Sequence, residues 1–316
     1  MEITAEIEKM TTYSVSESEK PFSVEDTISE NLELGVNTIL YGPPGTGKTY
    51  TVLDIISKKK LNQEIGEVLV IQFHPQYSYQ DFIEGYKFDG NGFVYKEGIF
   101  LDFCTRIDKN KINILYIDEI NRADLSSVFG ELLYLLDKDD EKSVNLPLKG
   151  TSFSLPKNLV IIGSMNSSDK SISLIDFALR RRFDFIFVPP SLDGFNEIIS
   201  RRQVSDDFDI AKYSKFFQVI NTRILKHPLL GKNMTLGHSM FFDKSGTISN
   251  KSTYKALTSV VIPQIEAYFG AENYSEIAQL LSPEIAQKLT YGKRFSLEEI
   301  IRLVDIVASS EEEVEF

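Results

Sequence analysis

The sequence contains few residues of the kinds that form disulfides and zinc sites. It has one cysteine, Cys104, and three histidines among 316 residues. A single cysteine excludes an internal disulfide, and three scattered histidines supply no zinc-binding spacing. We therefore expect neither a disulfide framework nor a structural zinc site.

Long apolar runs and an excess of basic charge are also missing. No run approaches the roughly 18 apolar residues that a membrane-spanning helix needs, and the first ten residues, MEITAEIEKM, lack the basic-then-apolar order of a secretory signal. The net charge of −12 at pH 7 argues against general binding to nucleic-acid phosphates. We expect a cytoplasmic protein without membrane contact, in which a local basic site remains possible.

Apolar, β-branched runs alternate with helical patterns through the first 190 residues. Such runs, separated by helices, predict a parallel sheet covered on both faces. The five runs are TILYG, EVLVIQFH, ILYIDEI, LVIIGSMN and FDFIFVPP. Residues 88–100 and 142–158 alternate around Gly or Pro and predict hairpins. Ser23 and Asp26 fit a capping box for a helix before the first strand.

The strand pattern ends near Pro190, and the segments that follow have a helical period. We therefore predict a tail or linker over residues 1–30, an α/β domain over 31–190, a helical domain over 191–308 and an acidic tail over 309–316.

The motif GPPGTGKT follows the first predicted strand and precedes a helix, the context that a phosphate-binding loop requires. Its glycines let backbone N–H groups surround phosphate oxygens, and the helix N-terminus adds positive dipole. Lys48 would contact the β- and γ-phosphates, and the Thr49 hydroxyl would bind Mg²⁺. The predicted nucleotide-binding residues are Gly42, Pro43, Pro44, Gly45, Thr46, Gly47, Lys48 and Thr49.

Two carboxylates follow the third strand. The apolar residues Ile114 to Ile117 deliver Asp118 and Glu119 to its carboxyl end, where ligands bind in open α/β sheets. Asp118 suits Mg²⁺ coordination, and Glu119 could orient and deprotonate the attacking water. The guanine-reading motif Asn-Lys-x-Asp is absent, because NKIN at Asn110 lacks the aspartate. From these residues alone the default nucleotide is ATP.

The fourth strand ends in Asn166, at the same edge of the predicted sheet. Its carboxamide could hold the attacking water or a γ-phosphate oxygen, or it could only close the strand into a turn. Asp169 could cap the next helix.

Three arginines, Arg180, Arg181 and Arg182, end that helix. Cations there complement the helix dipole by about 0.3–1 kcal/mol each, which suffices to explain Arg180. An arginine at a subunit edge can instead stabilise the charge that develops on a neighbour's γ-phosphate. We favour this second role for Arg181 and Arg182, since capping does not demand three guanidiniums.

The order of these features resembles the AAA+ superfamily, and several segments resemble its McrB family. They are IDEINRADLSSVFGELLYLL, FHPQYSYQDFIEGYK, MNSSDKS followed by IDFALRRRF, LGHSMFF and VVIPQIEAYFG. The similarity runs from about Asn37 to Gly270. It implies an AAA+ P-loop NTPase fold, with a five-stranded parallel sheet in residues 31–190 and a helical lid in 191–308.

The resemblance also implies a GTPase that assembles as a hexamer and powers modification-dependent DNA restriction with an McrC-like nuclease. Position by position, Glu119 resembles the catalytic glutamate and Asn166 the asparagine that positions water. Arg181 and Arg182 resemble the arginines given to the neighbouring subunit's nucleotide. Asp169 matches the signature aspartate, Arg122 the arginine just after the Asp-Glu strand, and His238 a lid histidine near the nucleotide.

Two departures accompany the resemblance. Lys170 stands where the family has arginine, which keeps the charge and loses the planar fork. The thirty or so polar residues before the motor cannot form the DNA-recognition domain that family members usually carry. We therefore expect contact with DNA to be indirect or to need a domain that this chain lacks.

Other readings remain open from the sequence. An ATP-driven remodelling enzyme of the MoxR type would share this architecture, and a non-hydrolysing assembly module would need neither Glu119 nor Asn166. The aromatic residues Tyr77, Tyr79, Phe82 and Tyr86 could line a pore, but we favour packing within the domain.

Overall fold

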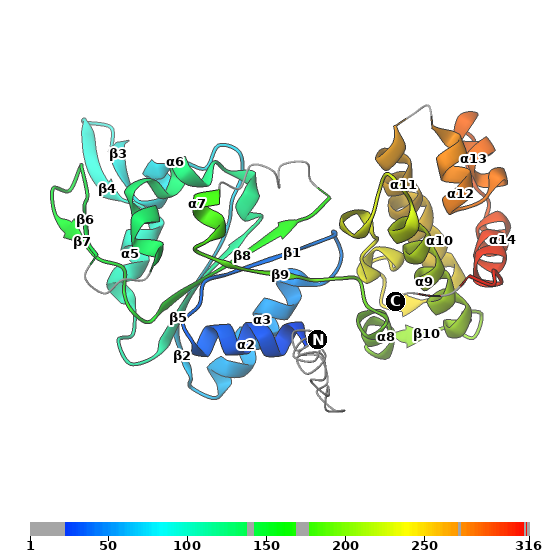
Figure 1. Cartoon of the computed structure of the whole chain (residues 1–316), viewed down its shortest axis with the longest axis horizontal. Helices are drawn as coiled ribbons and strands as arrows, with labels where there is room; N and C mark the ends of the chain where they lie inside the picture. The colour runs from blue at the N-terminus through cyan, green and yellow to red at the C-terminus, as the bar shows by residue number, and fades with distance from the viewer. Residues whose placement is uncertain (1–22, 138–141, 169–176, 271–272, 313, 315–316) are drawn as a thin grey trace, which may run out of the picture.

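The computed structural model describes residues 23–137, 142–168, 177–270, 273–312 and 314. The chain forms two lobes, each with a hydrophobic core of its own, connected through the segment that follows strand β9 (Figure 1).

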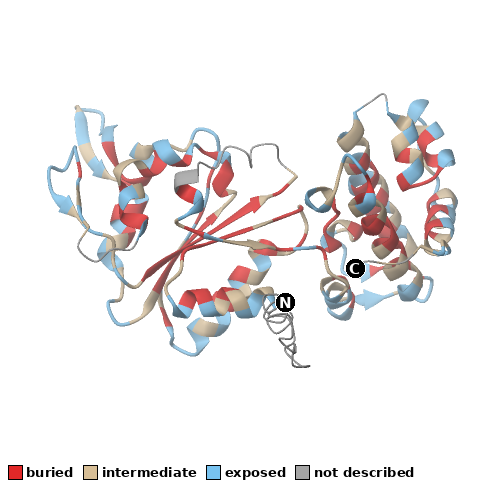
Figure 2. Ribbon diagram, in the orientation of Figure 1, coloured by how far each residue is buried: buried red, intermediate tan, exposed pale blue. Residues whose placement is uncertain are grey.

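Five parallel strands form the centre of the first lobe, in the order β2–β5–β8–β1–β9. In chain order they are β1 (Thr38–Gly42), β2 (Ile65–Gln72), β5 (Ile112–Asp118), β8 (Leu159–Asn166) and β9 (Asp184–Phe187). The three inner strands are buried along most of their length, as Figure 2 shows. The predicted five-stranded parallel sheet is therefore confirmed.

Helices cover both faces of this sheet, because alternate strand residues point to opposite sides. On one face Leu40 and Tyr116 pack with residues of helices α2 (Val24–Glu33) and α3 (Lys48–Leu61). On the other, Leu115 packs with a separate cluster of buried side chains. The elements on that side are α4 (Tyr79–Phe82), α5 (Ile99–Arg106), α6 (Leu125–Phe129), the 3₁₀ segments Ile120–Arg122 and Gly130–Asp137, and α7 (Phe177–Arg180). Helix α2 begins with the predicted Ser23–Asp26 capping box.

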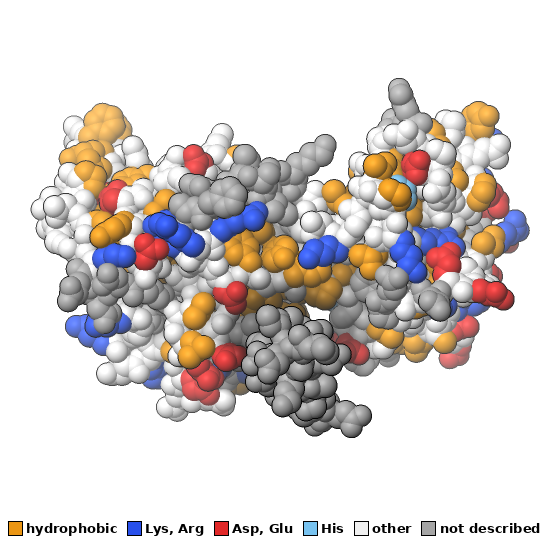
Figure 3. Space-filling view, in the orientation of Figure 1, with side chains coloured by type: hydrophobic (Ala, Val, Ile, Leu, Met, Phe, Trp, Pro, Cys, Tyr) orange, Lys and Arg blue, Asp and Glu red, His pale blue; other side chains and the backbone are white. Residues whose placement is uncertain are grey.

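Both predicted hairpins are present. They pair β3 (Glu84–Phe88) with β4 (Phe93–Glu97), and β6 (Val144–Asn145) with β7 (Ser152–Phe153). Glu84 is fully buried and joins the two hairpins, because its carboxylate accepts hydrogen bonds from Leu148 N at 2.8 Å and Lys149 N at 3.0 Å. The β3–β4 hairpin lies at the end of the lobe where exposed apolar side chains gather in Figure 3.

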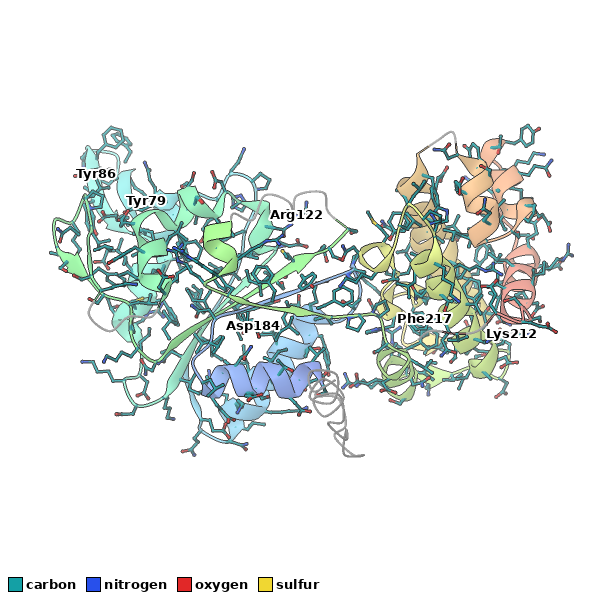
Figure 4. The ribbon with its side chains drawn as sticks, in the orientation of Figure 1. Tyr79, Tyr86, Arg122, Asp184, Lys212 and Phe217 are labelled. Atoms are coloured by element: carbon teal, nitrogen blue, oxygen red, sulfur yellow. The ribbon has the colours of Figure 1, made fainter. Side chains whose placement is uncertain are left out.

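The predicted aromatic packing is confirmed for three of the four residues. Phe82 is fully buried, and Tyr77 and Tyr79 pack against the same core. Tyr86, labelled in Figure 4, lies on β3 instead. Its side chain is 49% exposed. Helix α4 ends at Phe82, so Tyr86 does not share a helix with Tyr79 and Phe82.

The second lobe is mainly helical and has a core of apolar side chains between Phe195 and Val307. Its helices are α8 (Leu192–Ser200), α9 (Ile210–Lys226), α10 (Asn250–Ala256), α11 (Ile262–Phe269), α12 (Tyr274–Leu280), α13 (Pro283–Thr290) and α14 (Leu297–Ala308), with short helical turns at Lys232–Met234, His238–Phe241 and Leu257–Val261. The expectation that strands end near Pro190 is wrong in one detail. Strands β10 (Gln203–Val204) and β11 (Thr247–Ile248) form a parallel pair, too short to leave a period-two pattern.

Among the described residues, no helix combines the length and apolar character needed to cross a membrane.

Candidate active site

The sheet brings the predicted site residues together at the carboxyl ends of three neighbouring strands. In the register of β1 and β8, Gly42 stands opposite Asn166, and Ser167 N donates to Gly42 O at 2.8 Å. Strand β5 lies on the other side of β8 and ends at Asp118. Residues more than a hundred positions apart in the chain therefore share one edge of the sheet.

The loop of residues 42–49 has a backbone that its glycines make possible. Gly45 and Gly47 have φ values of 79° and 82°, in the left-handed region that glycine adopts without strain. Gly42 packs so closely under the chain after β9 that a Cβ atom would lie 2.3 Å from Val188 O. Gly47 is the N-cap of α3, so the positive end of this 14-residue helix faces the loop.

Lys48 is buried inside this loop. Its Nζ donates to Gly42 O at 2.9 Å and Pro43 O at 2.8 Å. These backbone carbonyls hold an ammonium group at the concave side of the loop, where a bound phosphate would meet it.

Thr49 and Asp118 form the expected pair for a divalent cation. The Thr49 hydroxyl lies 3.3 Å from Asp118 Oδ1. No three His, Cys, Asp or Glu side chains cluster as a metal site within the described residues. A hydroxyl and one carboxylate fit Mg²⁺, which typically takes few protein oxygens and completes its shell with phosphate and water.

Two polar residues that the sequence analysis did not single out orient Asp118. The Tyr116 hydroxyl donates to Ser164 Oγ at 3.0 Å, and Ser164 Oγ donates to Asp118 Oδ1. Burial raises the pKa of Tyr116 to about 12, so its hydroxyl keeps its proton at neutral pH. The sequence does contain an indication of this role. Tyr116 and Ser164 stand inside apolar strands, where a buried hydroxyl needs a hydrogen-bond partner.

Glu119 is held between two side chains. Asn166 Nδ2 donates to Glu119 Oε1 at 2.8 Å, and Arg122 Nε lies 3.4 Å from Glu119 Oε2. Glu119 also has φ 51°, a left-handed conformation that is strained for a residue with a Cβ. The structure therefore fixes this carboxylate beside Asn166 at a cost in backbone energy.

The arginine triplet divides into paired and exposed members. Arg182 forms a two-pronged ion pair with Asp137, at 2.9 Å from Nε and 3.2 Å from Nη2, and its side chain is 8% exposed. This pairing lowers the pKa of Asp137. Arg180 and Arg181 are exposed. Asp169 and Lys170 lie outside the described residues.

The second lobe contacts the phosphate loop through backbone hydrogen bonds. Gly237 N donates to Pro44 O at 3.2 Å, and Ser239 N donates to Gly45 O at 3.1 Å. A Cβ on Gly237 would lie 2.1 Å from the Gly45 carbonyl carbon, so only glycine fits there. His238, between them, is buried near Gly47, and burial lowers the pKa of His238 to about 4.

Two adjoining cavities complete the site. A cavity of about 290 Å³ is lined by residues of the phosphate loop together with Asp118, Glu119 and Asn166. A second, of about 590 Å³, lies between the start of α3 and helix α8. Gly47 and Tyr50 line both cavities, which therefore adjoin at the start of α3, and each is of a size that suits part or all of a nucleotide.

Comparison with known proteins agrees with this geometry. Residues 37–183 match the AAA domain family (dynein-related subfamily). The chain is 35% identical over 273 residues to the type IV methyl-directed restriction enzyme EcoKMcrB subunit of Escherichia coli K12, an alignment that covers 81% of this chain and 59% of that protein. It is 26% identical over 275 residues to the type II restriction enzyme BsuMI component YdiS of Bacillus subtilis 168, covering 69% of this chain and 76% of that protein.

The strain at Glu119 leads to a stability prediction. Glu119→Ala and Glu119→Gly remove the same hydrogen bonds, but only glycine relieves the left-handed backbone. We expect the glycine variant to be more stable than the alanine variant by about 1 kcal/mol in urea unfolding.

Glu30 provides the matched control, because it is exposed within helix α2. There the order should reverse, with alanine more stable than glycine by about 1 kcal/mol. Equal stability of the two Glu119 variants would show that the backbone carries no strain at this position.

Proposed function

This chain belongs to the McrB family of AAA+ proteins, and from that premise we propose that it is a GTP-hydrolysing motor subunit of a DNA restriction complex. The observation that carries the proposal is the placement of Asn166 and Glu119, 2.8 Å apart, beside a phosphate loop and the Thr49–Asp118 pair. A protein that only binds a nucleotide would need neither the Glu119 carboxylate nor the Asn166 carboxamide.

The phosphate loop binds the triphosphate in this proposal. Backbone N–H groups of the loop and the N-terminus of α3 surround the phosphate oxygens, and Lys48 exchanges its two carbonyl partners for phosphate. Thr49 and Asp118 would hold Mg²⁺, which supplies positive charge beside the β- and γ-phosphate oxygens. Tyr116 and Ser164 keep the Asp118 carboxylate in place for this task.

Hydrolysis then depends on Glu119 and Asn166. Glu119 accepts the proton of the water that attacks the γ-phosphorus, and Asn166 orients the carboxylate and the water. The partly exposed Arg122 side chain also forms an ion pair with Glu119. Its positive charge would influence how readily the Glu119 carboxylate accepts that proton.

Arg181 is the residue that we propose to act on a neighbouring subunit in a ring, as a hexamer would require. It is exposed, whereas Arg182 is engaged by Asp137 within the same chain. In this proposal Arg182 stabilises the end of α7 through its ion pair with Asp137. Arg181 extends toward the γ-phosphate bound by the neighbouring subunit. Asp169 keeps its proposed role as the signature aspartate of the same segment.

The restriction role follows from the relatives, each of which is a subunit or component of a restriction enzyme. We propose an McrC-like nuclease as the partner that supplies DNA cleavage. A net charge of −12 supports a motor that reaches DNA through other parts of the complex. The choice of GTP over ATP rests on the family.

Nucleotide preference tests the proposed function. The purified protein, assayed with its cognate nuclease subunit, should hydrolyse GTP faster than ATP. Glu119→Gln should reduce turnover by at least about 100-fold while nucleotide affinity stays within about twofold, because an amide keeps the shape and loses the base.

Two results would contradict the proposal. Faster hydrolysis of ATP would exclude a GTP-dependent motor, and undiminished turnover in Glu119→Gln would exclude this residue as the base.

Subunit mixing tests whether Arg181 acts across an interface. Arg181→Ala and Lys48→Ala subunits should each be inactive alone, since one lacks the arginine and the other cannot bind phosphate productively. Mixed together, they should recover part of the GTP hydrolysis, because some interfaces then combine an intact Arg181 with an intact phosphate loop.

Arg180→Ala is the matched control, an exposed arginine on the preceding residue. It should retain activity alone. No recovery in any Arg181→Ala and Lys48→Ala mixture would contradict action between subunits.

A further inference from the structure

The larger cavity is the place where a nucleotide bound by the phosphate loop would put its base. It shares Gly47 and Tyr50 with the phosphate cavity and extends from there along α3 to helix α8. Apolar lining comes from Val24, Val188 and Pro189, and the two valines belong to the same hydrophobic cluster of the first lobe. A purine whose phosphates lie against residues 42–49 would have this cavity beside it, because Thr46 and Gly47 of the loop line it.

The polar lining of this cavity is mostly acidic. Among its described lining residues are four carboxylates, those of Glu25, Asp54, Asp193 and Glu197, and a single cationic side chain, that of Lys58. Such a lining favours a ligand edge that presents hydrogen-bond donors.

Two of these carboxylates already have cationic partners. Asp54 pairs with Lys58 at 2.6 Å, and Glu197 pairs with Arg201 at 2.5 Å. Asp193 forms no hydrogen bond or ion pair within the described part of the chain. It lies in the first turn of α8, next to Gly194, and its carboxylate is available to a ligand.

His238 gives an independent sign that this cavity holds a ligand. Its side chain lines the cavity and is 9% exposed, and its buried Nδ1 has no hydrogen-bond partner. A buried polar atom without a partner costs about 1–3 kcal/mol, which a bound ligand can recover. The ring lies against both Gly47 and Gly194, and therefore connects the phosphate loop to the turn that carries Asp193.

Guanine and adenine differ at the edge that a carboxylate would contact. Guanine presents two donors, N1–H and the 2-amino group, which one carboxylate can accept together. Adenine has an unprotonated N1 and no 2-amino group, so a carboxylate at that position would face a lone pair.

We infer that Asp193 is the guanine-reading residue, accepting hydrogen bonds from N1–H and the 2-amino group of a nucleotide seated between α3 and α8. The inference rests on the GTP preference proposed above and identifies its determinant. In this inference the residue that distinguishes guanine from adenine belongs to the second lobe, whereas the residues proposed for hydrolysis belong to the first lobe. It also explains how a chain without an Asn-Lys-x-Asp motif can select guanine.

The test is nucleotide binding by calorimetry, in the Glu119→Gln background so that nucleotide is not consumed. Asp193→Asn should weaken GTP binding by about 10- to 100-fold, the effect of losing one bidentate contact. It should strengthen XTP binding, because xanthine carries a 2-oxo acceptor that the new amide can donate to. ATP affinity should not change, which also verifies that the variant is folded.

Three further variants make the assignment specific. Asp206→Asn, an exposed carboxylate of the same lobe outside the cavity, should leave all affinities unchanged. Asp54→Asn and Glu25→Gln change the other cavity carboxylates on α3 and α2. A switch from GTP to XTP in either of them, or an unchanged GTP affinity in Asp193→Asn, overturns the assignment to Asp193. Equal affinity of the parent protein for ATP and GTP would instead overturn the proposed GTP preference, and with it any guanine reader.

Discussion

The parallel register between β1 and β8 is the constraint on which the rest of the site depends. Because Gly42 stands opposite Asn166, the phosphate loop begins where the carboxamide ends its strand. The adjoining pair of β5 and β8 brings Asp118 and Glu119 to the same edge. A shift of one residue in either pairing would turn these side chains to the opposite face of the sheet, so the buried apolar strands determine the catalytic geometry as well as the stability.

Several features of this edge are unfavourable for folding and make sense only in terms of function. Lys48 is a buried cation held by two carbonyls, Glu119 has a left-handed backbone, and His238 contains a buried nitrogen without a partner. Each costs free energy that a structural role alone would not require. Their concentration around these two adjoining cavities supports the proposal that the active site lies there.

Much of the fold and of the site could be predicted from the sequence, because both leave local patterns. Apolar runs predicted all five sheet strands, and GPPGTGKT identified its loop by glycines that the backbone requires. Other features depend on contacts between distant residues. The pairing of Arg182 with Asp137 joins residues 45 positions apart, and the orientation of Asp118 by Tyr116 and Ser164 joins two strands. The prediction that Tyr86 packs within the domain is wrong, because α4 ends at Phe82 and Tyr86 lies on strand β3 with its side chain exposed.

The central claim is that Glu119 and Asn166 hold the water that attacks a triphosphate bound by residues 42–49. The most direct measurement is an experimental structure of the protein with a non-hydrolysable GTP analogue and Mg²⁺. The account predicts the β- and γ-phosphates against Lys48, the metal ion beside Thr49 and Asp118, and a water molecule within hydrogen-bond distance of both Glu119 and Asn166 in line with the γ-phosphorus. A triphosphate bound outside this loop, or a γ-phosphate with Glu119 turned away and no water between it and Asn166, would contradict the account.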